Sequence, residues 1–397
     1  MKLLAVEAAR ARMLAKVAPL PVEEAPLDES LGRVLAADIT ASRDQPPFAA
    51  SAMDGWAVRA ADTPGRLTIV GESAAGRGFA GELGPGQAVR IFTGAPVPAG
   101  ADAVVIQEDA GREGEAVVVP KVSDPRHIRP AGLDFSAGER LLTAGARLDP
   151  WHLALAAAAG RPSLPVFARP RVAILATGEE IAAPGAAVGP DQIYDSGTTT
   201  LAALVRSWGG QALTLPRVGD DAAAIAAAVQ GAACDLLVTL GGASVGDHDL
   251  VKPALERLGL VLAVESVAVR PGKPTWFGVL GDGRPVLGLP GNPASAMVCA
   301  ELFLRPLLSA LQGTDPALPI IAARSALTLG ANGEREAWMR ARLAFGASGE
   351  ITATPLTDQD SSLITVFAAA DALLRRPPRA PAIAAGDPVE ILPLRRL

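Results

Sequence analysis

The sequence predicts a multidomain protein of the α/β and β classes, organised around a doubly wound α/β domain at residues 169–313. In this stretch, short apolar runs alternate with helical patterns, which is typical of parallel βαβ units. Glycine-rich turns follow or connect several of the apolar runs, at the edge where sheets of this kind bind ligands. The flanking stretches are rich in glycine, valine and proline without a convincing helical stripe, and they predict smaller β domains.

The first βαβ unit is indicated by a buried-strand pattern at Arg171–Thr177, followed by a helical stripe of Leu201, Leu204, Val205 and Trp208. The stripe follows the i, i+3, i+4, i+7 spacing of one helix face. The second unit consists of predicted strands at Ala212–Val218 and Asp235–Leu240, a helix at Asp221–Ala232 capped by Asp220 or Asp221, and a further apolar stripe from Leu250 to Leu258.

The glycine turns lie at Gly241–Gly246, Arg270–Pro274 and Gly288–Ser295. Two of them open a predicted helix with a capping residue, Asp249 or Ser295. Such turns place backbone N–H groups and a helix N-terminus around a phosphate or another anion. A single anion-binding site explains all of these turns.

The other residues are predicted to form three further parts. Helical patterns at Leu3–Val17, Asp28–Ala37 and Pro150–Gly160 predict an elongated helical linking domain made of residues 1–45 and 138–168. Residues 46–137, between these two pieces, predict an inserted β domain. Residues 318–397 predict a small, β-barrel-like C-terminal domain.

The composition of the 397-residue chain, with 49% hydrophobic and 20% charged residues, is that of an ordinary globular protein. The net charge of −6 argues against nucleic acid as the main partner, because binding the phosphate backbone needs a basic face. Local cations would have to overcome this repulsive field to hold an anionic ligand. The candidate cations are Lys252, Arg270, Lys273 and Arg335.

The cysteines, the histidines and the N-terminus argue against a zinc-binding, secreted or membrane-spanning protein. The 2 cysteines, Cys234 and Cys299, lie in apolar surroundings and predict buried free thiols, and the 3 histidines lack the spacing of a zinc site. The N-terminus interleaves charges and lacks the apolar core of a signal peptide. No apolar run approaches the ~20 residues that a membrane span requires. We therefore expect a cytoplasmic protein without a membrane partner.

Several carboxylates have a plain structural explanation beside a functional one. Asp54 lies in an Asp-Gly turn, where it could bond to its own backbone. Asp195, or Ser196 beside it, and Asp249 are suited to cap helices, an interaction worth about 1 kcal/mol each. Lys273, between glycine and proline in a strand-connecting turn, has no such explanation.

The order of the motifs along the chain is more specific than any one of them. They are Pro46–Trp56 (PPFAASAMDGW), Thr93–Glu108 (TGAPVPAGADAVVIQE), Ala176–Glu180 (ATGEE), Gly241–Asp247 (GGASVGD), Pro271–Pro274 (PGKP) and Gly288–Pro293 (GLPGNP). In this order the chain resembles the molybdopterin molybdenumtransferases, the molybdenum insertases of molybdenum-cofactor synthesis, which are related to the C-terminal part of gephyrin. The resemblance covers nearly the whole chain.

The resemblance implies a fold, an assembly and a reaction. The α/β domain would be a molybdopterin-binding domain, and the protein a homodimer whose substrate pocket lies between the α/β domain of one subunit and the N-terminal β domain of its partner. Molybdenum from molybdate would be inserted into adenylated molybdopterin, with Mg²⁺ as cofactor and AMP released. Contact with the adenylyltransferase and with apo-molybdoenzymes is also implied.

The resemblance also assigns site residues. The catalytic residues would be Asp54, Asp249, Glu180 and Lys273. The substrate-binding residues would be Thr93, Gly241, Gly242, Ser244, Gly246, Asp195, Arg270, Pro290, Gly291, Asn292 and Ser295. Mg²⁺ would be held by Asp249, Asp247, Asp220 and Glu180, and molybdate by Arg335, Ser361 and Ser362.

Two other functions stay open, and departures of the chain from the family pattern at a few positions support one of them. Ala50 and Gly197 stand where asparagine is more frequent, and Arg270 and Ser266 where lysine is. The lost amides and charge favour a non-catalytic molybdopterin-binding or scaffold protein. A molybdopterin adenylyltransferase is the other alternative, because that enzyme has the same α/β domain; it is usually a single domain, so the flanking β domains favour insertion.

Overall fold

The computed structural model describes residues 3–123, 126–219, 221–241 and 250–395. The chain divides into two compact units, one made of residues 1–23, 32–36 and 165–397 and the other of residues 24–31 and 37–164. Each unit has hydrophobic clusters of its own. The predicted site residues that lie outside the described ranges are Asp220, Gly242, Ser244, Gly246, Asp247 and Asp249.

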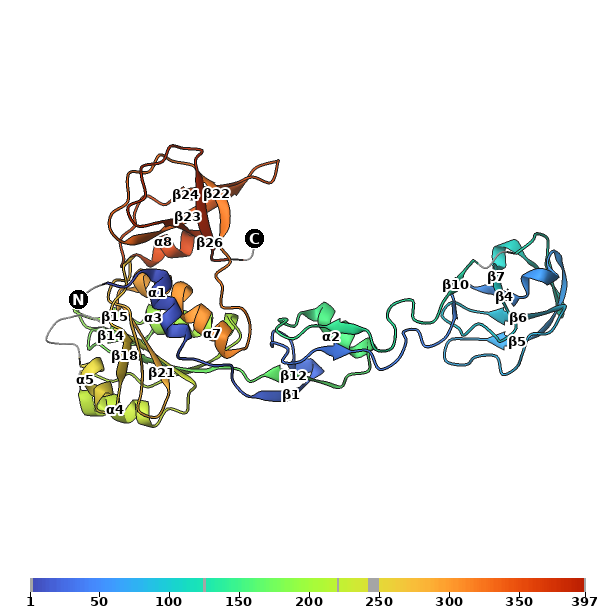
Figure 1. Ribbon diagram of the computed structural model, residues 1–397, viewed down its shortest axis with the longest axis horizontal. Helices are drawn as coiled ribbons and strands as arrows, with labels where there is room; N and C mark the ends of the chain where they lie inside the picture. The colour runs from blue at the N-terminus through green and yellow to red at the C-terminus, as the bar shows by residue number, and fades with distance from the viewer. Residues whose placement is uncertain (1–2, 124–125, 220, 242–249, 396–397) are drawn as a thin grey trace. The chain divides into compact units, whose positions relative to one another are not determined.

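The α/β domain of the first unit is built on a six-stranded sheet of order β16-β13-β17-β21-β20-β18 (Figure 1). Its strands are β13 (Arg171–Ala176), β16 (Gln211–Thr214), β17 (Leu236–Leu240), β18 (Val261–Val264), β20 (Trp276–Val279) and β21 (Pro285–Leu289). β16, β13, β17 and β21 run parallel, whereas β20 runs antiparallel to both of its neighbours, β21 and the edge strand β18. The predicted α/β sheet is confirmed, with this antiparallel edge added.

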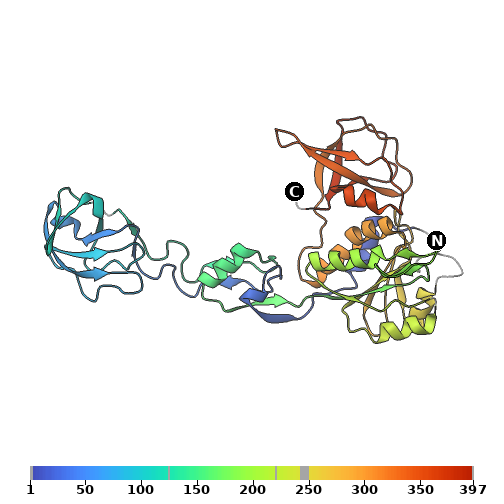
Figure 2. The same ribbon diagram turned by 180° about the vertical axis from the view of Figure 1, so that it is seen from behind.

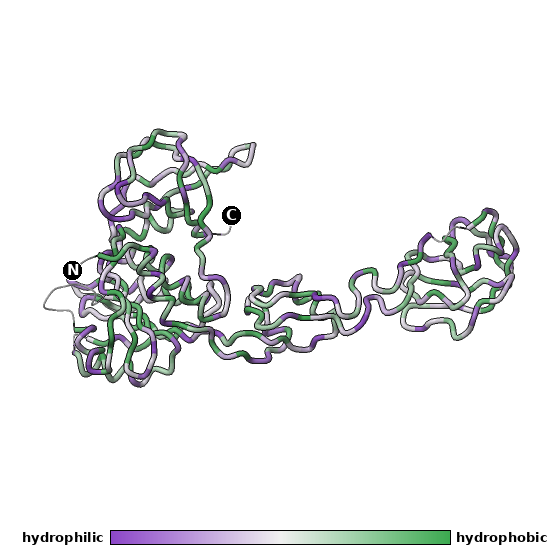
Figure 3. The backbone as a smooth tube through the Cα atoms, in the orientation of Figure 1, coloured by the Kyte–Doolittle hydropathy of each residue, from purple (hydrophilic) through white to green (hydrophobic). Residues whose placement is uncertain are grey.

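Helices cover both faces of the sheet, as the views from either side show (Figures 1 and 2). α4 (Ala222–Gln230) and α5 (Val251–Glu256) pack on one face, and α1 (Val6–Leu14) and α3 (Ser196–Ser207) on the other. Successive residues of β13 belong to opposite clusters, because side chains alternate across a strand. Hydrophobic residues accordingly run through the interior of this domain in Figure 3.

A continuous helix from Pro293 to Leu311 passes through the larger of these clusters. It consists of α6 (Pro293–Cys299), a π-helical turn (Ala300–Leu304) and α7 (Arg305–Leu311). Its length and composition would allow it to cross a membrane, but 83% of its apolar window is buried, which is the situation of a core helix. Within it, burial raises the pKa of the Glu301 carboxyl, and Arg305 pairs with that carboxyl at 3.1 Å.

The C-terminal domain is a closed barrel. Its strands are β22 (Ile321–Ser325), β23 (Glu336–Phe345), β24 (Ile351–Pro355), β25 (Ala372–Arg376) and β26 (Pro388–Pro393). β23, β24, β22, β26 and β25 pair in turn, and β25 pairs back with β23. β19 (Val269–Arg270) of the preceding domain pairs with β23, and α8 (Ile364–Ala369) packs against α6. The predicted barrel is confirmed.

The linking segments contain short strands as well as helices. β1 (Val22–Pro26) pairs with β12 (Ser163–Phe167), β2 (Ile39–Thr40) pairs with β11 (Arg140–Leu142), and Asp149 caps α2 (Pro150–Ala158). The predicted helix at Asp28–Ala37 is wrong. Only a 3-10 turn forms at Leu27–Glu29, because Gly32 adopts a left-handed φ of +73° and the chain then becomes extended.

The inserted β domain is a six-stranded sheet of order β7-β4-β6-β5-β9-β8. Its strands are β4 (Gly55–Val58), β5 (Gly65–Ser73), β6 (Gln87–Ile91), β7 (Ala103–Ile106), β8 (Gly111–Glu113) and β9 (Ala116–Val119), and β3 (Ala50–Ser51) pairs with β10 (Ile128–Arg129) beside it. Gly55, at the start of β4, faces Ile91 and Ile106, the last residues of β6 and β7. The start of one strand and the ends of its two neighbours therefore meet at one edge.

Candidate functional site

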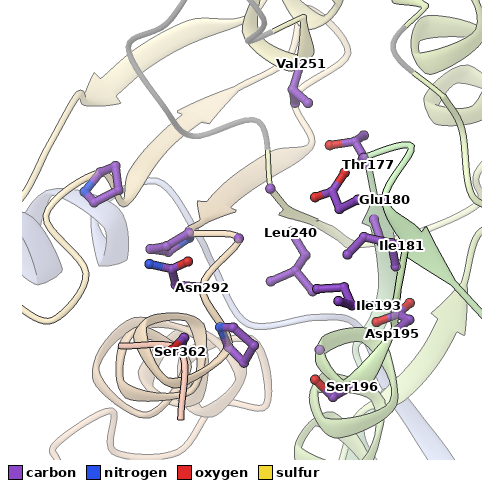
Figure 4. Close-up of a pocket in the computed structure, with 18 of the residues that line it drawn as sticks. Thr177, Glu180, Ile181, Ile193, Asp195, Ser196, Leu240, Val251, Asn292 and Ser362 are labelled. Carbon is purple, nitrogen blue, oxygen red and sulfur yellow. The ribbon is translucent and has the colours of Figure 1, made fainter. Parts of the chain in front are cut away.

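A pocket of about 1040 Å³ lies at the carboxyl ends of β13, β17 and β21, close to the upper limit of the size range of small-molecule sites. Its lining includes residues 176–178 after β13, Leu240 and Gly241 at the end of β17, and residues 290–293 after β21. Figure 4 shows Asn292 and Ser362 on one side of the pocket and Glu180, Ile181 and Asp195 on the other. The predicted ligand edge of the sheet thus carries a pocket.

The chain segments at the pocket floor approach each other closely. Gly241 has a left-handed φ of +89°, and a Cβ there would lie 3.1 Å from the carbonyl oxygen of Thr177. A Cβ on Gly291 would lie 3.5 Å from Gly241. The N–H of Gly241 already donates to the carbonyl of Leu289, so this group is not a free donor for an anion.

The turn at Asn292 forms hydrogen bonds between the α/β domain and the C-terminal domain. Asn292 is the N-cap residue of α6, but its side chain makes no capping bond; its amide donates to Ser361 Oγ over 3.0 Å. The N–H of Ala294 donates to the Ser361 carbonyl, also at 3.0 Å. The prediction that Ser295 caps this helix is wrong, because Ser295 is buried inside the first turn.

The opposite wall is formed by a short two-stranded ladder and the start of α3. β14 (Ile181–Ala182) pairs with β15 (Ile193–Tyr194), and the Ile193 N–H donates to the Glu180 carbonyl. Asp195 caps α3, as predicted, by accepting a 2.8 Å hydrogen bond from the Thr198 N–H on Oδ1. The Asp195 carboxylate therefore has a structural task as well as a place on the pocket wall.

Of the predicted cations, Lys252 and Lys273 line the pocket. The turn that carries Lys273 is built tightly: Gly272 has φ +113°, and a Cβ there would lie 2.1 Å from Cys299 Sγ. Burial raises the pKa of the Cys299 thiol to about 12, so this cysteine serves as packing rather than as a nucleophile. Arg270 lies in β19 opposite Ala337 of the barrel.

The predicted molybdate residues have different partners in the structure. Ser361 bonds to Asn292 and Ser362 lines the pocket, whereas Arg335 approaches the Val269 carbonyl at 3.5 Å. Arg340, which was not predicted, donates to the Asp360 carbonyl next to these serines at 2.7 Å. Hydrogen bonds from Ser362 in turn lower the pKa of the Asp360 carboxyl.

No local sequence signal marks Arg340. It is buried, and its Nε has no hydrogen-bond partner in the described structure. It lies two residues after the buried Trp338, on the face of β23 opposite to the one that packs in the barrel core. Because that face also carries Glu336 and Arg342, the alternation along the strand predicts a polar face and does not single out Arg340.

The inserted domain holds the other predicted pair, Asp54 and Thr93. Oδ1 of Asp54 accepts hydrogen bonds from both the Thr93 N–H and the Thr93 hydroxyl, each at 2.8 Å. These bonds, and to a smaller extent the nearby charge of Arg90, lower the pKa of the Asp54 carboxyl. The Asp54 carboxylate is thus bonded across the turn to another loop.

Of the departures from the family pattern, Gly197 has a steric explanation, and Ser266 and Ala50 are buried. Gly197 is packed so closely that a Cβ would lie 2.2 Å from Leu240 Cδ2, so a larger residue requires Leu240 to move. Ser266 is buried and lines the pocket, and its carbonyl accepts from the Leu4 N–H. Ala50 is buried in β3 opposite Arg129.

The fold and the pocket define a class: an α/β protein with a pocket at its strand ends, carrying an inserted β domain and a C-terminal barrel. Family models match residues 4–160 as the MoeA N-terminal region (domain I and II), residues 173–310 as the probable molybdopterin binding domain, and residues 322–394 as the MoeA C-terminal region (domain IV).

Whole-chain relatives agree with these matches. Molybdopterin molybdenumtransferase 2 of Mycobacterium tuberculosis is 37% identical over 96% of both chains, and molybdopterin molybdenumtransferase of Haemophilus influenzae is 33% identical over 100% of both. The solved molybdopterin biosynthesis moea protein from Pyrococcus horikosii has a TM-score of 0.87 at 32% identity over 100% of both chains. This chain belongs to the molybdopterin molybdenumtransferases, a family of transferases in molybdenum-cofactor biosynthesis, as the motif order predicted.

The Asp54–Thr93 pair predicts an acid-dependent loss of stability. Because the folded-state pKa of Asp54 is lowered, its contribution is complete above the ordinary aspartate pKa of about 3.9 and disappears as pH falls through the lowered value. Thr93→Val removes the hydroxyl donor, raises the pKa of Asp54 and weakens this dependence. Urea unfolding from pH 7 to pH 2 measures it, with Thr68→Val, an exposed position in β5, as control. Identical pH profiles for Thr93→Val and wild type would contradict the assignment.

Proposed function

We propose that the protein inserts molybdenum from molybdate into adenylated molybdopterin and releases AMP in a Mg²⁺-dependent reaction. The observation that carries this proposal is the meeting of Lys273, the helix N-terminus at Asn292 and the Ser362 hydroxyl in one pocket. The substrate is a polyanion that must be bound close to a second oxyanion. Family membership favours the same reaction.

Two lysines would hold the phosphoanhydride. Lys252 and Lys273 supply positive charge locally in a chain whose net charge is −6. Lys252 is held with its Nζ 5.7 Å from the centre of the Trp276 ring. The helix that begins at Pro293 adds the positive end of its dipole. Together these groups offset the substrate's charge and orient its phosphates.

The carboxylates of the pocket fit a Mg²⁺ ion that is held mainly through the substrate. Mg²⁺ prefers one or two carboxylates together with phosphate oxygens and waters. Glu180 and the second oxygen of Asp195 supply these on the pocket wall, and no cluster of three or more His, Cys, Asp or Glu able to hold a metal lies among the described residues. Asp220, Asp247 and Asp249 stay predicted ligands. Bound Mg²⁺ would neutralise charge on the anhydride.

Molybdate would be received on the side of the pocket formed by the C-terminal domain. Ser361 offers a hydroxyl there, Ser362 stays a predicted ligand whose hydroxyl donates to Asp360 Oδ1 over 2.6 Å in the described structure, and Arg335 remains the predicted cation. We add Arg340, because its guanidinium bonds to the backbone of the same serine loop while its Nε has no partner. An oxyanion close to these serines would meet both donors and positive charge.

The direct test combines product release with transfer of the metal. The purified protein, incubated with adenylated molybdopterin, Mg²⁺ and molybdate, should release AMP only when molybdate is present and should reconstitute an apo-molybdoenzyme. Tight binding of the pterin without AMP release would overturn the proposal in favour of a scaffold protein. Adenylation of molybdopterin from ATP would instead identify an adenylyltransferase.

Lys273→Ala should weaken binding of adenylated molybdopterin by about tenfold or more, because a charge-assisted contact to phosphate is lost. Its melting temperature should stay close to that of wild type, since Lys273 is exposed. Isothermal titration calorimetry and thermal melting check both statements, with Lys16→Ala as a control at another exposed lysine. Unchanged affinity would remove Lys273 from the phosphate site.

The homodimer is a further part of the proposal. Light scattering of the purified protein should give about 81 kDa, twice the 40.4 kDa of the chain. A mass near that of the single chain at working concentrations would overturn it. Contacts with the adenylyltransferase and with apo-molybdoenzymes are proposed on the same family grounds.

A further inference from the structure

We propose that Arg90 is a positioning residue for the Asp54–Thr93 pair, acting as a clamp on the chain segments that meet at the start of β4. Its relevance to the reaction rests on the proposed function, in which Asp54 and Thr93 serve the substrate. The clamp itself is a property of the inserted β domain alone.

The strand register brings the segments together. Gly55 faces Ile91 and Ile106, so the turn at Asp54, the loop at Thr93 and the turn at Gln107 all leave the sheet at one edge. The approach is close, because a Cβ on Gly55 would lie 1.9 Å from the carbonyl oxygen of Val105. Because no side chain fits at position 55, side chains from neighbouring positions have to hold the loops in place.

The guanidinium of Arg90 connects two of these segments by hydrogen bonds. Nη1 donates to the Gly55 carbonyl at 3.0 Å, and Nη2 donates to Oε1 of Gln107 at 2.8 Å. The Gln107 N–H in turn donates to the Asp54 carbonyl at 3.1 Å. The backbone on each side of the Asp54 side chain is thereby tied to the same arginine.

Aromatic contacts bring in the third segment. Cζ of Arg90 lies 5.3 Å from the centre of the Trp56 ring and 4.8 Å from that of Phe92. Trp56 is buried and stands opposite Arg90 in the register, and Phe92 directly precedes Thr93. A planar guanidinium can contact two rings and two oxygens at once, which a lysine ammonium cannot do.

These contacts explain how a carboxylate at the edge of a sheet keeps one orientation. Asp54 and Thr93 belong to different segments, and their two hydrogen bonds form only while the segments keep their spacing. Arg90 contacts a residue next to each member of the pair, Gly55 and Phe92. Loss of the clamp should therefore loosen the Thr93–Asp54 bonds before it unfolds the domain.

The test follows the Thr93 amide by NMR in the full-length protein, as wild type, Arg90→Lys and Arg90→Met. In wild type its chemical shift should titrate with Asp54, below the ordinary aspartate range. In Arg90→Met the midpoint should rise and exchange of the Thr93 N–H should accelerate on the order of tenfold. Arg90→Lys, which keeps the charge without the fork, should accelerate exchange as well. Arg66→Met, which removes an exposed arginine paired with Glu113 in the same domain, should change neither.

Unchanged titration and exchange at Thr93 in Arg90→Met, with only a lowered melting temperature, would overturn the proposal and leave Arg90 as packing for Trp56. The amide measurement needs no turnover, so a protein that releases no AMP would contradict the proposed function without affecting this test. If AMP is released, Arg90→Met should lower its rate on the order of tenfold, as expected when a reacting group is mispositioned.

Discussion

The buried helix that begins at Asn292 is the constraint on which the pocket depends. Its first turn binds the serine loop of the barrel through the Ser361 carbonyl, and Cys299, further along, packs beneath Gly272 in the turn that carries Lys273. Because a Cβ at Gly272 would collide with the sulfur, the lysine turn has one close-packed position relative to the helix. The glycine turn before Pro293 and the lysine turn are thus oriented by one core element.

In the inserted β domain, too, a close backbone approach at a glycine and one contacting side chain fix the position of the loops. The close backbone approach at Gly55 brings two loops to one edge, and a single arginine spans them. In both places glycine allows the approach and a buried or half-buried side chain fixes the result: Cys299 under one turn, Arg90 across the other. Rigid elements beneath the turns are what a binding site needs to hold polar groups in place.

Local sequence patterns predicted several helices, strands and the cap by Asp195. Features that depend on contacts between segments distant in sequence were not predicted. The strand at β13, the stripe of α3 and the cap by Asp195 follow from periodicity and capping rules within a few residues. The cap assigned to Ser295 failed because the helix already begins at Pro293, where the Ala294 N–H donates to the carbonyl of Ser361, far away in sequence. Arg340 was missed for the same reason, since its partner at Asp360 lies across a hairpin.

We propose that the substrate binds at the strand ends of the α/β sheet, beside the start of the buried helix. Hydrogen–deuterium exchange of the protein with and without adenylated molybdopterin tests it most directly. Slower exchange is predicted at residues 177–182, at residues 291–296 and in the serine loop at residues 359–363, with the far ends of β13 and β17 unchanged. Protection confined to other surfaces, with these segments unaffected at saturating ligand, would contradict binding at the strand ends.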